Sequence, residues 1–172
     1  MVIGPFLALL FAIIETSLIY FAEFTVDAAV QNAARSIRTG TLQSGKYNAA
    51  QFKKIVCKDL PAFVTCDGSV MVDVRCFDTF AEAAAGMPNP LNGDGTINPN
   101  SSKFQMGGPN QVVVVSVFYD WKLMAKFPGL GDFTGKMGLG MGNLPDGTRL
   151  ISAQTAFQTE AYAGTGVPPK CS

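Results

Sequence analysis

Apolar residues in a helical pattern run through the first 40 positions of the chain. Charged side chains interrupt the first 24 residues only at Glu15 and Glu23. A bilayer core is crossed by roughly 20 apolar helical residues, so this stretch is long enough to span a membrane. From residue 25 onward, apolar positions recur at helical spacing on one face and polar positions occupy the other. We therefore predict one continuous helix, transmembrane over residues 1–24 and forming an amphipathic neck over residues 25–40.

The neck has a narrow apolar face and clear signals for its end. The apolar face consists of Val26, Ala29, Val30, Ala33, Ala34 and Ile37. Its small residues favour packing against the protein's own sheet. Gly40 is suited to the left-handed conformation that closes many helices, and Arg35 and Arg38 complement the negative end of the helix dipole. The helix is therefore predicted to end near Thr39.

The pattern changes from helical to strand-like after the neck and one further helix. That helix is predicted over residues 49–58, with Asn48 as its N-cap. Apolar and polar residues alternate over 69–77, which is typical of a half-buried strand. Residues 111–121 are β-branched and apolar on both faces, which indicates the central strand, and residues 149–162 alternate less regularly. We predict an α+β fold in which a long N-terminal helix precedes a small antiparallel sheet.

Composition excludes several classes of function. The net charge is zero over 172 residues, so the chain lacks the basic surface that nucleic acids require. It contains no histidine, the commonest general base and metal ligand, so no Ser-His or Cys-His pair exists. The carboxylates Asp73, Asp78, Asp120 and Glu160 are scattered over the predicted strands, and we expect them at the surface. We predict no enzyme activity, metal site, cofactor or nucleic-acid partner.

Four cysteines lie beyond the apolar helix, at Cys57, Cys66, Cys76 and Cys171. An even number of cysteines in a domain tethered to a membrane favours two disulfides and an oxidising compartment. Three pairings are possible, and we favour Cys57–Cys66 together with Cys76–Cys171. Free thiols in a cytosolic fold are the alternative, and a zinc site is weaker because no two cysteines have the spacing of a zinc knuckle.

The cysteines also decide the expected orientation in the membrane. The first positive charges follow the apolar segment, at Arg35 and Arg38, and the positive-inside rule would place the following domain in the cytoplasm. Disulfides require the opposite side, and long domains translocate largely regardless of charge. We therefore predict a single-pass membrane protein, with residues 41–172 forming a disulfide-stapled α+β domain outside the cytoplasm.

Five stretches of the chain carry a family pattern in a fixed order. They are IIETSLIYFAEFTVDAAVQNAARSIRTG, IVCKDLPAFVTC, VMVDVRCF, VSVFYDWKLM and NLPDGTRLISAQTAFQTEAY. Together they resemble the TadE/TadG-like family, the minor pilins and assembly proteins of bacterial tight-adherence (Flp-type) pili. The first and last stretches are the most specific. The resemblance implies a pilin-like fold, no catalysis, and contacts with other pilin-like subunits and with the pilus assembly machinery. It also implies a location in the bacterial inner membrane, with residues 41–172 in the periplasm.

The chain departs from that family pattern at its beginning. The family usually carries a short basic leader and a prepilin-type cleavage site just before a Glu near the start of the mature helix. Here residues 1–5 already follow the helical pattern, with no leader and no such Glu. We therefore expect the natural helix to start upstream of Met1, and processing by a prepilin peptidase is not predicted from this sequence.

Three acidic residues of the predicted helix are the candidate contact residues. An ionised carboxylate at the centre of a bilayer costs roughly 2.5–3.5 kcal/mol, so Glu15 is expected to find a partner in a neighbouring subunit's helix. The alternative is a neutral Glu15 without any partner. Glu23 and Asp27 lie one turn apart and are predicted to form a hydrated exit from the membrane.

These observations lead to two functional hypotheses. The first is a non-catalytic minor pilin that supports initiation or assembly of a tight-adherence pilus through helix–helix contacts. The second is a membrane-tethered periplasmic binding module that uses the loop over residues 84–110 and the apolar flap over residues 122–147.

Overall fold

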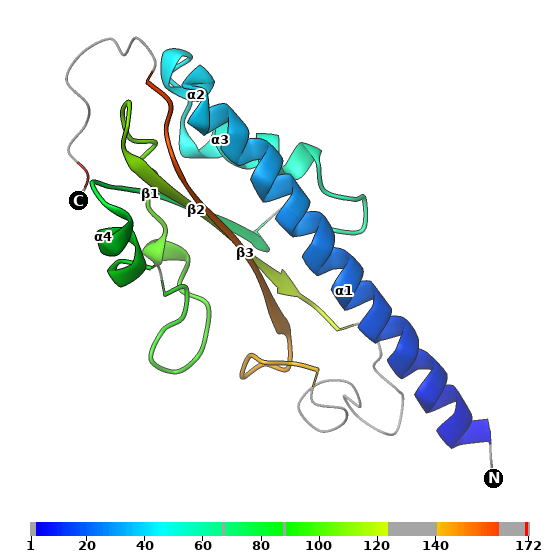
Figure 1. Ribbon diagram of the computed structural model, residues 1–172. Helices are drawn as coiled ribbons and strands as arrows, with labels where there is room; N and C mark the ends of the chain where they lie inside the picture. Colours follow the sequence, from blue (N-terminus) through cyan, green and yellow to red (C-terminus); the bar gives the residue numbers. More distant parts are fainter. Residues whose placement is uncertain (1–2, 67, 88, 124–140, 162–170, 172) are drawn as a thin grey trace.

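A long N-terminal helix, against which the sheet packs, is the largest element of the fold. The computed structural model describes residues 3–66, 68–87, 89–123, 141–161 and 171 (Figure 1). Helix α1 (Ile3–Arg38) is continuous over 36 residues, and Gly40 follows it with a φ of 74°. The predicted helix and its left-handed cap are thus confirmed. Figure 1 shows that the N-terminal part of α1 extends beyond the sheet.

Three antiparallel strands form the sheet, in the order β1-β2-β3. They are β1 (Val70–Phe77), β2 (Val112–Trp121) and β3 (Arg149–Gln158). The predicted α+β fold and the central position of the second strand are confirmed. Strand β3 ends earlier than predicted. The Gln111 N–H donates to the hydroxyl of Thr159 rather than to its backbone carbonyl, and the N–H of Glu160 donates to Arg38 of α1 rather than to β2.

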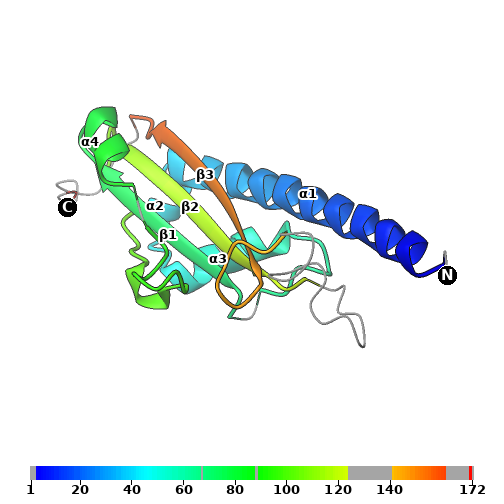
Figure 2. The same ribbon diagram turned by 90° about the horizontal axis from the view of Figure 1, so that it is seen from below.

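The main core lies between the sheet and one face of α1. All six residues of the predicted apolar face of the neck are buried. They meet the side chains of β2 that point toward α1, among them Val113, Val115 and Val117. Figure 2 shows α1 running along one side of the sheet. The small residues on the helix permit this close approach because they leave room for the branched side chains of β2.

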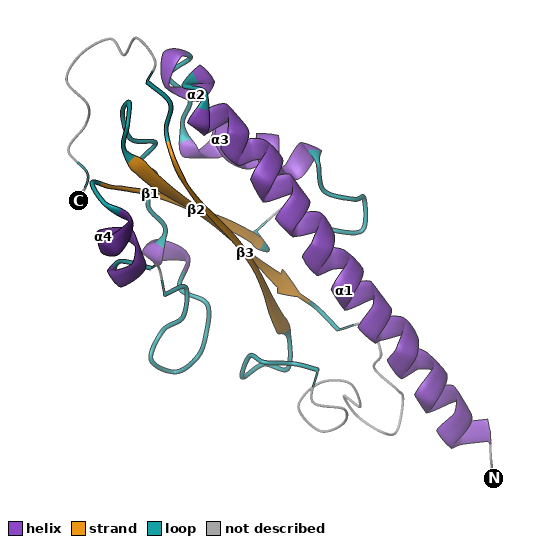
Figure 3. Ribbon diagram, viewed as in Figure 1, coloured by secondary structure: helices purple, strands orange, loops and turns teal. Residues whose placement is uncertain are grey.

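Short helices complete the fold (Figure 3). Helix α3 (Ala49–Lys58) has the predicted bounds, and Asn48 and Gln51 form a reciprocal capping box at its start. Helix α2 (Thr41–Ser44), helix α4 (Phe80–Ala85) and the 3₁₀ turn η1 (Pro99–Ser101) were not predicted. Helix α4 covers the face of the sheet turned away from α1, where Ala83 packs with Val112 and Val114.

The expectation that Asp73 lies at the surface is wrong. Asp73 is 1% exposed and forms an ion pair with Arg75 at 2.8 Å. The segment around η1 covers this part of β1, and the backbone N–H of Lys103 donates to the Asp73 carboxylate at 2.7 Å. Backbone bonds between Val74 and residues 103 and 105 fix the segment along β1. Part of the 84–110 loop thus buries the Asp73 side chain, which the alternation of inward and outward residues along β1 would otherwise leave in water.

Candidate functional site

Helix α1 is divided into two parts by its contacts with the rest of the chain. Residues 3–14 include no buried side chain, and the first buried residue is Glu15. Burial then recurs at Ile19, Ala22 and Val26 and continues through the neck. By length and composition, α1 is apolar enough to cross a membrane. Packing against the sheet therefore begins inside the segment predicted as transmembrane, before residue 24.

Glu15 is held within its own chain. Its side chain is 3% exposed, and the indole N–H of Trp121 donates to one carboxylate oxygen at 3.3 Å. Trp121 closes strand β2 and is itself buried, so the two residues join α1 to the end of the central strand. Neither alternative drawn from the sequence included an intramolecular partner. A contact between Glu15 and another subunit stays a prediction.

Hydroxyl groups near Glu15 are satisfied by the helix itself. The side chain of Thr16 donates to the carbonyl oxygen of Ala12, and that of Ser17 donates to Ile13, each at 2.8 Å. Both residues are exposed. Hydroxyls bonded in this way present little free polarity to their surroundings. The exposed side of α1 at this level is therefore compatible with an apolar environment such as lipid or a neighbouring helix.

Glu23 and Asp27 have different partners. Glu23 accepts from Arg149 at the start of β3, with an ion-pair distance of 3.0 Å, and both side chains are about one-third exposed. Arg149 also donates to the carbonyl oxygen of Met141. Asp27 accepts from the side-chain amide of Gln31 at 2.7 Å. Glu23 thus forms a second link between α1 and the sheet, and Asp27 is bonded within the helix.

An aromatic cluster lies beside the Glu15–Trp121 pair. The ring centroid of Phe63 is 6.2 Å from that of Trp121 and 5.7 Å from that of Phe21 on α1. Phe63 belongs to the loop that the Cys57–Cys66 disulfide closes. This disulfide is one of the two pairings favoured from the sequence. The short covalent ring fixes the loop next to the helix.

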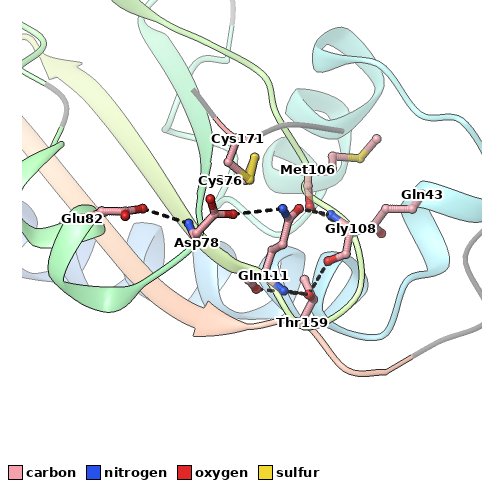
Figure 4. Close-up of a disulfide and its surroundings, with 9 residues drawn as sticks. All are labelled: Gln43, Cys76, Asp78, Glu82, Met106, Gly108, Gln111, Thr159 and Cys171. Carbon is pink, nitrogen blue, oxygen red and sulfur yellow. Dashed lines mark hydrogen bonds between the residues drawn. A yellow bond between two sulfur atoms is a disulfide. The ribbon is translucent and has the colours of Figure 1, made fainter. Parts of the chain in front are cut away.

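The second disulfide joins Cys76 of β1 to Cys171 (Figure 4). A polar network lies beside it, and the side chain of Gln111 is at its centre. Gln111 accepts from the N–H of Gly108 at 2.7 Å and donates to Asp78 at 3.4 Å. The Thr159 hydroxyl donates to the carbonyl oxygen of Gly108 at 2.6 Å. This network holds the entry to β2 and the exit from β3 next to the disulfide.

The loops over residues 84–110 and 122–147, predicted to serve a binding module, present few groups arranged for ligand binding among their described residues. In the 84–110 loop, the Asp94 carboxylate accepts from the backbone and hydroxyl of Thr96, and these bonds lower the pKa of Asp94. Most of the 122–147 flap, residues 124–140, lies outside the described residues. Among the described residues, no three His, Cys, Asp or Glu side chains gather where a metal ion would bind.

Comparison with known proteins finds a family match in the N-terminal part of the chain. Residues 1–35 match the family model described as TadE-like protein. No curated protein and no solved structure matches the chain. The matched segment covers the exposed apolar part of α1, Glu15, and most of the neck that packs on the sheet. The helix that carries the exposed apolar stretch is thus similar to the N-terminal segment of TadE-like proteins.

Proposed function

We propose that this protein is a non-catalytic, membrane-anchored minor pilin that supports initiation or assembly of a tight-adherence pilus. The residues after α1 form its periplasmic domain, and other pilin-like subunits are its partners. The observation that carries the proposal is the exposed apolar side of α1, which lies inside the segment that matches the TadE-like family. The two disulfides support a location outside the cytoplasm.

The exposed side of α1 has the geometry of a helix–helix contact. Phe6, Ile13, Tyr20 and Phe24 are all exposed, and their spacing of seven, seven and four residues places them along one side of the helix. Glu15, Ile19 and Ala22 are buried on the opposite side. A neighbouring subunit's helix would therefore meet the aromatic and branched side chains of this stripe, while the other side of α1 stays on the sheet.

Cysteine crosslinking in cells that assemble the pilus tests this proposal. Ile13→Cys and Tyr20→Cys each place one thiol on the stripe. It is the only free thiol of the variant, because the four native cysteines are all bonded. Phe80→Cys on α4 is the matched control, since Phe80 is also an exposed aromatic residue but lies on the far face of the sheet. We expect the two stripe variants to capture the helices of pilin-like subunits and the control to capture none.

Two results would contradict the proposal. One is equal capture at the stripe and at Phe80. The other is a protein that alkaline carbonate releases from the membrane fraction, because a helix that spans the bilayer resists that extraction.

A further inference from the structure

The end of the domain next to the exposed part of α1 has a distinct surface, called the tip. It surrounds a hollow of about 300 Å³, bounded on one side by Leu18 of α1 and on the other by Phe63, Tyr119, Trp121 and Lys122. Thr65, Ser69 and Asp120 complete the lining, so three of its eight residues are aromatic. The tip therefore combines aromatic rings with polar and charged groups at the point where the domain meets the helix that we propose to be its membrane anchor.

Phe63 is the exposed aromatic residue of the tip, since Tyr119 and Trp121 are buried. Its side chain is 45% exposed even though it contacts Phe21 and Trp121. The Cys57–Cys66 ring restricts the loop, so the phenyl ring cannot easily retreat into the core. An aromatic ring held in water forgoes the stabilisation that burial of its apolar surface provides. A partner that accepts one edge of the tip into an apolar environment would supply that burial.

The charged residues beside the hollow limit the kinds of partner that can bind the tip. Lys122 and Asp120 border the same hollow, and Lys122 is exposed. One charge of each sign next to aromatic rings matches the headgroup boundary of a phospholipid bilayer, where aromatic residues concentrate and lysines reach phosphates. The bare hydrocarbon core does not suit Lys122, since a charged side chain is costly there.

The same level of α1 also carries an exposed aromatic group. Tyr20, Phe21 and Phe24 are exposed where the helix passes the tip, and exposed apolar side chains continue from there to Ile3. The exposed surface of the tip is thus continuous with the surface of the proposed anchor. In the other direction along the helix, the exposed positions become polar from Gln31 onward.

We propose that the tip rests in the interface of the phospholipid bilayer that holds α1, with Phe63 inserted between the headgroup-proximal ends of the acyl chains. The domain is then fixed against the membrane at two points, the helix and the Phe63 loop. This inference rests on the proposed membrane anchorage of α1. It adds that the folded domain itself contacts lipid before any other subunit covers it.

Fluorescence quenching by brominated lipids tests the contact. The chain has a single tryptophan, Trp121, so one added tryptophan can be followed after the wild-type signal is subtracted. Phe63→Trp reports on the tip, and Phe80→Trp is the matched control because Phe80 is 55% exposed on α4. The full chain is reconstituted at low density in vesicles of phosphatidylcholine and phosphatidylglycerol. A parallel set contains phosphatidylcholine brominated near the headgroup end of its chains.

We expect the brominated lipid to quench Phe63→Trp several-fold more than Phe80→Trp, and aqueous acrylamide to show the reverse order. Equal quenching of the two variants by the lipid overturns the inference. Protection of Phe63→Trp from both quenchers also overturns it, because a second copy of the chain would then cover the tip. Protein that fails to float with the vesicles contradicts the anchorage itself, whereas protein that floats without lipid quenching at position 63 contradicts only the tip contact.

Discussion

At Glu15, a carboxyl group in an apolar helix is bonded by an indole from the far end of the central strand. The bond joins residues 106 positions apart in the sequence. A carboxyl group removed from water is destabilising unless donors surround it, and the indole N–H is a donor attached to a large apolar ring. Trp121 thus supplies both a hydrogen bond and a cover that separates the carboxyl group from the exterior.

Substitution of Trp121 by Phe keeps an aromatic ring but removes the N–H. A typical hydrogen bond contributes about 0.5–1.5 kcal/mol net, and we expect the loss of this bond to lower the free energy of unfolding by about that amount. The control is Tyr119→Phe, a neighbouring buried aromatic residue whose ring contacts that of Trp121. Chemical denaturation of the full chain in detergent compares the two. Equal losses for both variants would show that the indole bond contributes little.

Residue-scale predictions from the sequence succeeded where the signal was local. Gly40 could be identified because a glycine follows a helical pattern that ends in two arginines. The Glu15–Trp121 pair could not, since its two residues meet only when the sheet docks on the helix. Asp73 was misplaced for a related reason. The Lys103 N–H that donates to its carboxylate, and the Ser101 carbonyl that accepts from its ion-pair partner Arg75, come from a distant loop.

Among the elements, α3 shows how strongly a local signal determines a boundary. Asn48 accepts from the N–H of Gln51, and the Gln51 side chain accepts from the N–H of Asn48, each at 2.9 Å. These bonds satisfy backbone donors that have no partner within the helix. The start of α3 was predictable for this reason, whereas the six-residue α4 is too short to show a helical period.

Removal of the α3 cap has a predictable cost. In Asn48→Ala the first turn of the helix loses its side-chain acceptor, and we expect the free energy of unfolding to fall by about 1 kcal/mol. Asn32→Ala is the control, since Asn32 is exposed inside α1, where alanine is a better helix former. Thermal unfolding followed by circular dichroism measures both. A cap variant as stable as the control would contradict the prediction.

The turn before β3 predicts a small dependence on pH. The Asp146 carboxylate accepts from the hydroxyl and the backbone N–H of Thr148, and these bonds lower its pKa in the folded state. A lowered pKa means that the carboxylate stabilises the fold above its unfolded pKa and that this stabilisation is lost as the pH falls through the folded value. Because Asp146 is exposed, the effect is expected to stay below about 1 kcal/mol.

Two variants check this turn. Asp146→Asn should be slightly less stable than the wild type at neutral pH, and the difference should vanish in acid. Thr148→Val removes the hydroxyl donor, so the pKa of Asp146 should rise toward its ordinary value. Titration of the carboxyl group by nuclear magnetic resonance measures that change. An unchanged pKa in Thr148→Val would show that the hydroxyl is not the main cause.

At the scale of the whole molecule, two disulfides close covalent rings of very different size. The Cys57–Cys66 disulfide spans nine residues, and the Cys76–Cys171 disulfide spans 95. The larger ring contains α4, β2 and β3. The pairing could be favoured from the sequence because two of the cysteines lie close together, but the position of Cys171 beside β1 depends on the complete fold.

Removal of the two disulfides should have unequal effects. A cross-link stabilises mainly by restricting the unfolded chain, so the double Cys76→Ser and Cys171→Ser variant is expected to lose about 4.5 kcal/mol and the Cys57→Ser and Cys66→Ser variant somewhat less than about 3 kcal/mol. Denaturation of each variant under non-reducing conditions measures the difference. A greater loss from the smaller ring would indicate that its role is to hold the Phe63 loop in place.

Helix α1 lies outside both covalent rings. A pull along the axis of this helix is therefore resisted by side-chain packing, the Glu15–Trp121 bond and the Glu23–Arg149 ion pair, none of which is covalent. The strands β2 and β3, in contrast, are enclosed by a bond that does not yield to such a force. Under tension the helix would separate from the sheet first, and the sheet would lose its main core, but the Cys76–Cys171 bond would keep β2 and β3 from being drawn out.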